Sequence, residues 1–370
     1  MKDPRLENLA KILVNYSTKV KKNDKVMIRG TPLLPVAAPL VLDVYREVLK
    51  AGGFPHLHMN LDEQLYIFLT EASDHQLLQP DLVRKMVIEE FDVEINIWSS
   101  SNTRVMTSIK PEKWKLFGQA YKDLYEMKSN RTSSEDYRWV YTMYPTHAYA
   151  QDADMSLIEF ADFIFSTTHA DSDNPIEYWE KLGKDQQKYV DWLAGKEKVK
   201  IIGEGIELDM SIKDRTFINC CGQENMPDGE IYTGPVEESV NGIVKFSYPC
   251  IWSGVEVDGV ELTFEKGKVI KARADKNEDF LLGAIKADHG ASYIGEFGIG
   301  TNYQIDRFTR NMLFDEKMGG TIHLALGSGY PESGSKNKSA IHWDLLTDMR
   351  NGGNILVDDE LFYESGEFKI

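Results

Sequence analysis

The sequence contains little cysteine, with three residues in 370. Cys220 and Cys221 are adjacent, Cys250 stands apart, and no two of them have the Cys-x-x-Cys spacing. This pattern excludes a disulfide framework and argues against a thiolate metal site. So few cysteines fit a reducing compartment, and we predict a cytoplasmic protein.

Long hydrophobic runs are also missing. The longest, Leu33 to Leu42, is short and is interrupted by Pro35 and Pro39, so it is not expected to span a membrane. The N-terminal segment MKDPRLENLAKILVNY has no uninterrupted apolar region of the kind found in secretory signal peptides. We therefore expect a soluble protein without a membrane partner.

The chain has no excess of positive charge. It has 42 Lys and Arg residues against 59 Asp and Glu residues, which gives a net charge of −17. Sequence-independent nucleic-acid binding and docking on anionic lipid both need basic side chains, so the composition argues against both. A cationic substrate is compatible with the charge, although a solvated acidic surface explains it more simply.

The length of 370 residues suggests two domains. In the first half, helical and strand patterns alternate, which predicts an open, mostly parallel α/β sheet domain over residues 1–195. The expected helices are Ala38–Lys50, which ends at Gly52 and Gly53, Pro80–Glu90 and Glu112–Met127, and the expected strands are Lys25–Gly30, His56–Asn60 and Val93–Ser99.

In the second half, short strand patterns and turn dipeptides dominate, and we expect it to form a β-rich α/β domain over residues 196–370. It follows a helix that includes Gln186–Leu193. Asp258-Gly259 and Lys266-Gly267 separate β-rich segments and predict a strand meander. A further helix is expected at about Glu278–Asp288.

Common nucleotide and hydrolase motifs do not fit this chain. The segment GYPESGSK (Gly329–Lys336) has the glycines of a phosphate loop but places Ser335 where the lysine belongs. GEFGIG lacks the third glycine of a dinucleotide fingerprint, and no Gly-x-Ser-x-Gly is present. His56 and His58 would share one face of a strand, where we expect them at the surface.

Acidic residues and histidines recur beside glycines in four later segments, where the backbone can approach a ligand closely. His342 and Asp344 are two residues apart on a β-rich stretch, so their side chains should point to the same face. His323 should lie on the face opposite Ile322 and Leu324. The segments are NMPDGEIYTGP, GEFGIGTN, FDEKMGGTIHLALGSGYP and SAIHWD.

Together these segments offer carboxylates and imidazoles without a thiolate, a donor set that suits Zn²⁺, Co²⁺, Mn²⁺ or Mg²⁺. Three carboxylates carry more negative charge than one divalent ion requires, so a bridged pair of ions would compensate them better. The candidate ligands are Glu230, Glu296, His323, His342 and Asp344.

In this order, the segments resemble the M29 family of metallo-aminopeptidases, of the thermophilic aminopeptidase T type. The resemblance runs along the whole chain and also includes KVKKNDKVMIRG near the start and AQDADMSL at Ala150–Leu157. The segment KMGGTI before His323 looks longer than in the family, and His289 stands where a small residue or proline is usual.

The resemblance implies a role for each matching residue. Glu230 and Glu296 would bind metal, with Glu296 bridging two ions, and Glu316 would be a ligand or lie close to the site. His323, His342 and Asp344 would complete the metal site, and Tyr330 would donate its phenol proton to the developing oxyanion.

The implied reaction is the release of single N-terminal residues from short peptides by two divalent ions (Zn, Co, Mn or Mg) that activate a water. Glu316 is our candidate for the general base, with Glu237 and Glu238 as substitutes, although those two fit a solvated acidic pair better. Asp288 and Asp348 could orient the ligand histidines. The family also implies a homodimer with its sites facing an enclosed interior.

Three other functions are alternatives to the aminopeptidase. A two-metal phosphoesterase would use similar ligands, but no Arg or Lys cluster stands beside the glycine-rich segments to hold phosphate. A mononuclear iron oxygenase needs a histidine after its His-x-Asp pair, and His342 is the last histidine of the chain. A non-catalytic binding protein would not need a liganding residue at every matched position.

Overall fold

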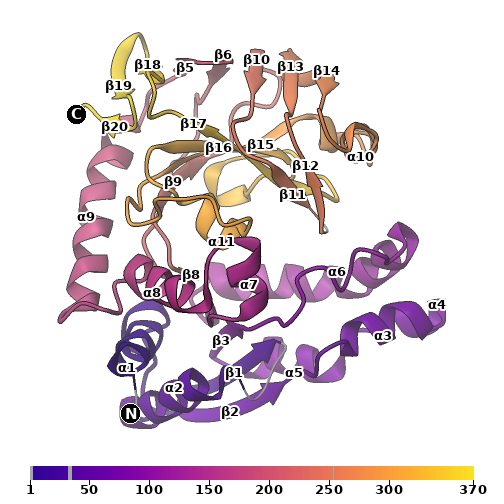
Figure 1. Ribbon diagram of the computed structural model, residues 1–370, viewed down its shortest axis with the longest axis vertical. Coiled ribbons are helices and arrows are strands. Elements are labelled where there is room, and N and C mark those ends of the chain that lie inside the picture. Colours follow the sequence, from indigo (N-terminus) through magenta and orange to yellow (C-terminus); the bar gives the residue numbers. More distant parts are fainter. Residues whose placement is uncertain (1–2, 32–35, 253) are drawn as a thin grey trace. The chain divides into compact units, whose positions relative to one another are not determined.

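The computed structural model describes residues 3–31, 36–252 and 254–370, and the chain divides into two compact units (Figure 1). Unit 1 comprises Met1–Tyr178 and Gly222–Pro227, and unit 2 comprises Trp179–Cys221 and Asp228–Ile370. The change between the units therefore falls within helix α9 (Pro175–Leu193). The domain boundary expected at residue 195 stays a prediction.

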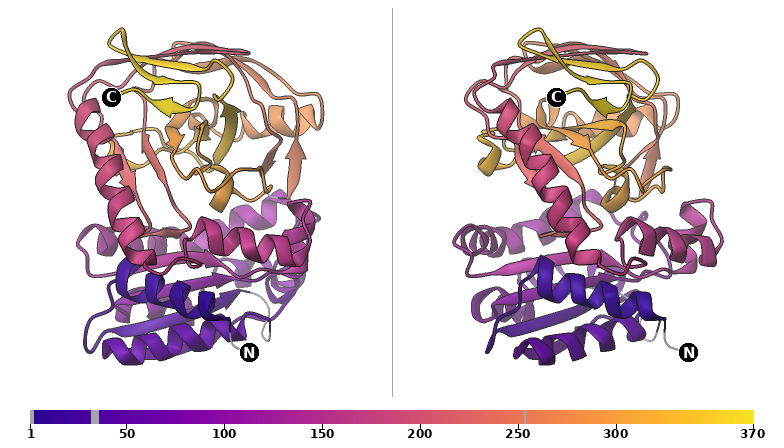
Figure 2. Two further views of the ribbon diagram at one scale, coloured as in Figure 1. Left: turned by 60° about the vertical axis from the view of Figure 1, so that its left-hand side comes forward. Right: turned by 90° about the vertical axis from the view of Figure 1, so that its left-hand side faces the viewer.

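Unit 1 is built on a five-stranded parallel sheet with the order β2-β1-β3-β4-β8. Val26 and Met27 point to opposite faces of the sheet and both are buried, so both faces are covered. Figure 2 shows helices on both sides of the strands. The strands are β1 (Lys25–Thr31), β2 (Phe54–Met59), β3 (Val93–Trp98), β4 (Arg138–Met143) and β8 (Asn225–Met226).

The helices of unit 1 follow most of the predicted pattern. Helix α2 (Ala38–Ala51) ends at Gly52, whose φ of 85° is the left-handed conformation that glycine adopts easily. Before β1, the chain forms α1 (Pro4–Lys11) and then a π-helical segment, Ile12–Ser17. The remaining helices are α3 (Gln64–Glu71), α4 (Asp74–Leu77), α5 (Leu82–Glu90), α6 (Pro111–Ser133), α7 (His147–Asp152) and α8 (Leu157–Thr167).

Unit 2 contains two large antiparallel sheets that share one hydrophobic core, besides the two-stranded pair β11–β12. The eight-stranded sheet has the order β14-β13-β10-β6-β5-β18-β19-β20, and the five-stranded sheet has the order β17-β16-β15-β9-β7. Ile201 and Leu208 of the larger sheet belong to the same buried cluster as Phe297 and Leu324 of the smaller one. Side chains from the two sheets therefore fill one core.

The strands of the larger sheet are β5 (Lys198–Gly203), β6 (Ile206–Ser211), β10 (Asn241–Lys245), β13 (Glu261–Glu265), β14 (Lys268–Arg273), β18 (Asn354–Val357), β19 (Glu360–Glu364) and β20 (Glu367–Phe368). Those of the smaller sheet are β7 (Ile218–Cys220), β9 (Glu230–Thr233), β15 (Ile294–Gly300), β16 (Thr321–Gly327) and β17 (His342–Asp348). Two short helices, α10 (Glu278–Ala284) and α11 (Met312–Asp315), complete the unit.

The predicted meander is only partly correct. The turn at Lys266-Gly267 joins β13 and β14 as an antiparallel hairpin, and both of its residues have positive φ, as a tight hairpin turn requires. The strand before Asp258-Gly259, β12 (Val255–Val257), pairs instead with β11 (Cys250–Trp252). Strand pairing depends on contacts across the fold, which turn residues alone do not define.

The predicted fold class is confirmed, because the chain combines a parallel α/β sheet with antiparallel sheets. Among the helices described for residues 3–31, 36–252 and 254–370, none is long and apolar enough to cross a bilayer.

Candidate metal centre

One face of the five-stranded sheet in unit 2 carries the acidic and imidazole side chains. Glu296 of β15 lies opposite Ala325 of β16, which in turn lies opposite Asp344 of β17. Because side chains alternate along a strand, the residues at even spacing from this row share its face. They are Glu230, Tyr232, Glu296, His323, His342 and Asp344.

The other face of the same strands is apolar. Ile322 and Leu324 flank His323 in β16, and both belong to the buried core. The structure thus confirms the predicted alternation around His323 and the shared face of His342 and Asp344. One face stabilises the fold and the other presents polar groups.

Gly298 makes room for the imidazole of His323. Gly298 lies opposite His323 in the sheet, and a Cβ atom at that position would stand 2.1 Å from His323 Cε1. Any other residue would displace the ring, so glycine here serves the position of the imidazole rather than a turn.

The carboxylate of Glu296 lies between two imidazoles. Its Oε1 is 3.1 Å from His323 Nε2, and its Oε2 is 3.5 Å from His342 Nε2. Glu230 Oε2 is 3.2 Å from His323 Nε2, and Asp344 Oδ2 is 3.5 Å from His342 Nε2. Two possible ligand groups result, one with Glu230 and His323 and one with His342 and Asp344, and both include Glu296.

The chemistry of these donors fits divalent metal ions. All are carboxylate oxygens or imidazole nitrogens, and Glu230 and Asp344 are buried. Within the described residues, Glu230 Oε2 and Asp344 Oδ1 have no hydrogen-bond partner. Burial raises the pKa of Glu230 to about 8, against the opposing charge of Lys317. A buried carboxylate with such a proton affinity needs a cation in order to ionise.

The pKa of His323 also reflects the surrounding acids. Burial alone would lower it, but the hydrogen bond with Glu296 and the charge of Glu230 raise it to about 10. Both residues therefore hold protons that a metal ion would have to displace.

A third possible ligand group was not expected from the sequence. It joins Cys220 of β7 and Asp228 to Glu230. Cys220 lies opposite Glu230 in the sheet, although the two are 10 residues apart in the chain. A search for Cys-x-x-Cys spacing cannot find such a pair. The cysteine spacing argues against a thiolate site, but the register of β7 and β9 brings one thiol to the edge of the centre.

Glu316 and Lys317 follow helix α11 directly. Glu316 forms an ion pair with Lys317, whose Nζ also lies 3.4 Å from Glu230 Oε1. The Lys317 side chain is 0% exposed. Burial would lower the pKa of this lysine, but the two carboxylates raise it well above its usual value, so its ammonium stays charged.

Glu316 stands apart from the possible ligand groups found among the described residues. Burial raises the pKa of Glu316, while Lys317 opposes the rise. The sequence indicated Glu316 but missed Lys317, because DEK after a short helix is typical of a solvated surface.

Tyr330 lies at the edge of the centre, three residues after β16. Its ring centroid is 5.1 Å from that of His342 and 5.4 Å from that of Tyr232, and the residue is 40% exposed. Desolvation and the carboxylates of Glu296 and Asp344 raise the pKa of Tyr330. Its phenol therefore keeps its proton near neutral pH.

A backbone carbonyl orients His342. Its Nδ1 lies 2.7 Å from the Ser328 carbonyl oxygen, so Nδ1–H donates and Nε2 faces Glu296 and Asp344. Asp288 and Asp348, the two candidates for orienting the ligand histidines, have other partners. Asp288 accepts a hydrogen bond from Ser339, and Asp348 accepts one from Arg350.

The other candidate bases also have partners of their own. Glu237 forms an ion pair with Arg215 at 2.6 Å and accepts a hydrogen bond from the Lys336 amide. It is therefore not part of a solvated acidic pair. Glu238 is exposed.

A family model described as thermophilic metalloprotease (M29) matches residues 2–368. Aminopeptidase 2 of Geobacillus stearothermophilus is 23% identical over 394 aligned positions, which cover 100% of this chain and 94% of that protein. Aminopeptidase AmpS of Bacillus subtilis (strain 168) is 28% identical over 210 positions, 53% of this chain and 51% of AmpS. In that match the chain spans about half the length of its relative.

Two solved structures share the fold. Wild-type AmpT from Thermus thermophilus superposes with a TM-score of 0.85 at 20% identity, over 99% of both chains. A 2,5-dihydroxypyridine dioxygenase from Pseudomonas putida KT2440 superposes with a TM-score of 0.61 at 12% identity, over 98% of this chain and 96% of the dioxygenase. These likenesses concern the fold alone.

Proposed function

The chain belongs to the thermophilic metalloprotease family M29 and is a metal-dependent hydrolase of the aminopeptidase type, and we propose that it releases single N-terminal residues from short peptides with two divalent ions as cofactors. The observation that carries the two-ion proposal is the position of Glu296, shared by two groups of possible ligands. Glu230, Glu296 and His323 would hold one ion, and Glu296, His342 and Asp344 the other.

Charge supports two ions over one. Glu230, Glu296, Glu316 and Asp344 bring four carboxylates to the centre against the single ammonium of Lys317. When all four are ionised, one divalent ion does not neutralise them. Zn²⁺, Co²⁺, Mn²⁺ and Mg²⁺ all accept these donors. A metal pair supplies a polarised carbonyl and a water with a lowered pKa.

Glu316 is the proposed general base. It lies outside the groups of possible ligands, and burial raises its pKa, which strengthens it as a proton acceptor. Its carboxylate would take the proton of the attacking water and deliver it to the leaving amine. The ammonium of Lys317 would hold that carboxylate in place through their ion pair.

Tyr330 is the proposed donor to the oxyanion. The partly exposed phenol at the edge of the centre can reach a substrate, and its raised pKa keeps the O–H available. The excess carboxylate charge around it would bind the protonated α-amino group of a peptide, which favours N-termini over internal bonds.

We further propose a cytoplasmic homodimer. The three cysteines are free, which suits a reducing compartment. Leu61 and Leu82 in unit 1 are 76% and 79% exposed, and such side chains suit a contact with a second copy. Light scattering coupled to gel filtration should give twice the mass of one chain, and the mass of a single chain would contradict the dimer.

The experiment that tests the activity is hydrolysis of leucine p-nitroanilide before and after EDTA treatment, with Zn²⁺, Co²⁺, Mn²⁺ or Mg²⁺ added back. We expect chelation to abolish activity and one of these ions to restore it. Tyr330→Phe should lower kcat by roughly 100-fold, as loss of an oxyanion donor does, while the metal content stays unchanged.

Two control reactions separate the alternatives. Hydrolysis of p-nitrophenyl phosphate without peptidase activity would favour a phosphoesterase. Turnover that requires Fe²⁺ and O₂ would favour the chemistry of the dioxygenase with the same fold. Failure to cleave leucyl, alanyl and arginyl substrates with every ion would refute the aminopeptidase proposal and favour a binding protein.

A further inference from the structure

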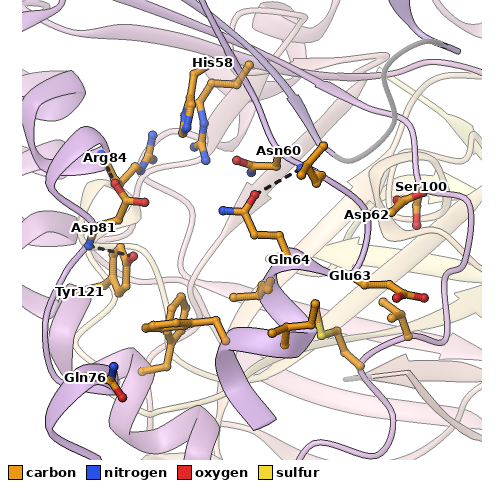
Figure 3. A pocket seen from close by; sticks show the side chains of 18 of the residues that line it. His58, Asn60, Asp62, Glu63, Gln64, Gln76, Asp81, Arg84, Ser100 and Tyr121 are labelled. Atoms are coloured by element: carbon orange, nitrogen blue, oxygen red, sulfur yellow. Dashed lines mark hydrogen bonds between the residues drawn. The ribbon is translucent and has the colours of Figure 1, made fainter. Parts of the chain in front are cut away.

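Unit 1 contains a cavity of about 1010 Å³ whose lining includes none of the proposed metal ligands (Figure 3). Its lining includes Arg29 of β1, His58 of β2, Tyr141 of β4, and Ser100, two residues after β3. These strands are parallel, and the cavity lies towards their carboxyl ends. Open α/β sheets commonly bind ligands at this edge, and the volume suits a small organic molecule.

The two faces of this parallel sheet differ in chemistry. On one face Ile28, Ile95 and Val140 lie side by side and are fully buried. On the other, the register places four polar or aromatic side chains in one row across four strands, in the order His58, Arg29, Asn96 and Tyr141. Polar groups under covering helices destabilise a fold unless they are paired, so this row calls for a functional explanation.

Basic side chains and carboxylates lie together behind this row. Arg29 Nη1 lies 3.0 Å from Glu94 Oε1, and Arg84 Nη1 contacts the same oxygen. Lys128 Nζ stands 3.6 Å from the centroid of the Trp139 ring and interacts electrostatically with Glu94 and Glu224. Asp81 lines the cavity beside Arg84 and adds a third carboxylate, so three basic groups stand with three carboxylates, and burial lowers the pKa of Lys128 to about 8.

Several donors in this region are unused. The side chains of Arg29 and Arg84 are 18% and 11% exposed, and a guanidinium carries five N–H donors. Within the described residues, Arg29 Nε and Asn96 Nδ2 are buried without a hydrogen-bond partner, and Asn96 is only 2% exposed. Neither of these two atoms is open to the cavity, and Asn96 does not line it, so the donors left for a ligand are the other N–H groups of Arg29 and Arg84.

The remainder of the lining is apolar on the inside and acidic at the rim. Phe68, Met106 and Phe117 supply apolar surface. Asp62 and Glu63 lie on the side of the cavity opposite Arg84 in Figure 3, and Gln64 points into the space between. An anion with a single charge meets less repulsion from this rim than a dianion does.

We propose that this cavity binds a small organic carboxylate, with its anionic group on Arg29 and Arg84 and an aromatic or aliphatic body against Phe68 and Phe117. Such a ligand would accept from the N–H groups of Arg29 and Arg84 that Glu94 leaves unused. The site is separate from the metal centre in its residues, and the proposal stands whether or not the chain cleaves peptides.

Three probes of one shape test the ligand class by isothermal titration calorimetry on the metal-loaded protein: phenylacetate, its neutral isostere phenylacetamide, and phenyl phosphate. We expect phenylacetate to bind at least about tenfold more tightly than phenylacetamide, because a charge-assisted pair is lost in the amide. Equal binding of the two would overturn the anion site. Binding of phenyl phosphate alone would overturn the assignment of a carboxylate.

Three variants locate the binding. Arg84→Gln removes one guanidinium, and Gln64→Trp fills the cavity while it leaves the ion pairs intact, so each should weaken phenylacetate binding about tenfold or more. Arg46→Gln, which removes a surface arginine paired with Asp43, is the matched control and should bind normally. If Gln64→Trp binds phenylacetate like the unaltered protein, the ligand occupies another place.

Carboxylates can also bind metal ions, so a fourth variant is needed. Glu296→Gln removes the carboxylate shared by the two ligand groups and should keep its phenylacetate binding. Loss of binding in this variant would assign the ligand to the metal centre and overturn the proposal.

Discussion

The ammonium group of Lys317 lies in the interior of unit 2, in contact with the carboxylates of Glu230 and Glu316. A buried cation beside a metal centre limits how much positive charge the ions must supply. Its charge also opposes the rise in the pKa of Glu316 that burial causes. At the scale of single residues, the ion pair of Lys317 with Glu316 distinguishes Glu316, the proposed base, from the proposed ligands.

Replacing Lys317 tests this role. Lys317→Met leaves the buried carboxylate of Glu230 and the partly exposed carboxylate of Glu316 without their cation, so the metal-free protein should lose about 3 to 5 kcal/mol of unfolding free energy. A bound metal ion would neutralise Glu230, so the loss should be smaller in the loaded protein. Thermal melts with EDTA and with Zn²⁺ measure both losses, and Lys188→Met, at an exposed pair with Asp185, is the control. Equal losses in the two states would contradict this role.

The pH dependence of stability follows from two raised pKa values. In the metal-free protein the pKa of Glu230 is about 8 and that of His323 about 10, so the folded state binds protons that the unfolded chain has released. The stabilisation from these protons is complete below the unfolded pKa values and is lost as the pH rises through the folded values.

We therefore expect the Tm of the EDTA-treated protein to fall between about pH 6 and about pH 9. Because a metal ion must displace the same protons, the gain in Tm on adding Zn²⁺ should grow over this range. Differential scanning calorimetry at several pH values measures both trends. A constant gain across the range would show that these two groups are not ligands.

At the scale of elements, the site depends on strand pairing. Strand β15 supplies Glu296 and Gly298, and its register against β16 brings Gly298 under His323. One strand therefore contributes both a proposed ligand and the space for another. The short helix α11 ends directly before Glu316, the proposed base.

Gly298→Ala should damage the metal centre more than the fold. The new Cβ would stand 2.1 Å from His323 Cε1, so the ring must move and its Nε2 with it. We expect a loss of bound metal and at least a roughly 100-fold loss of activity, as displaced catalytic groups typically cause. Metal analysis and leucine p-nitroanilide hydrolysis measure these effects.

Gly118→Ala is the matched control for this substitution. Gly118 lies within helix α6, and a Cβ there meets nothing within 4 Å. Because alanine favours helix more than glycine does, this variant should gain about 0.5 to 1 kcal/mol of unfolding free energy. If Gly298→Ala retained full metal content, the packing argument for Gly298 would be wrong.

At the scale of the whole molecule, the proposed metal centre links four strands that come from distant parts of the sequence. Glu230, Glu296, His323 and His342 lie on β9, β15, β16 and β17. An ion that binds only the folded arrangement stabilises it by mass action, by about 4 kcal/mol at a thousand times its Kd.

Removal of metal should therefore lower the Tm by roughly 10 °C, since about 1 kcal/mol corresponds to 2–4 °C for a domain of this size. Melting curves with EDTA and after restoration of Zn²⁺ measure the shift. Glu296→Gln should show a much smaller shift, because both ligand groups lose the shared carboxylate. An unchanged Tm after chelation would mean that the fold does not depend on the ions.

Several features of the fold and the candidate site could be predicted from near neighbours in the sequence. The period of two along a strand placed His342 and Asp344 on one face and His323 opposite Ile322 and Leu324. Gly52 marked the end of helix α2. The donor types indicated a divalent metal, because carboxylates and imidazoles prefer such ions whatever their arrangement.

Only the tertiary structure decided which groups meet. Cys220 reaches Glu230 through the pairing of β7 and β9, β12 pairs with β11 instead of β13, and Lys317 is buried against two carboxylates. In unit 1, the row from His58 to Tyr141 exists because four strands align in one register. The physical reason is common to all of these cases: alternation and capping act between near neighbours, whereas pairing and burial depend on segments that meet only after the chain has folded.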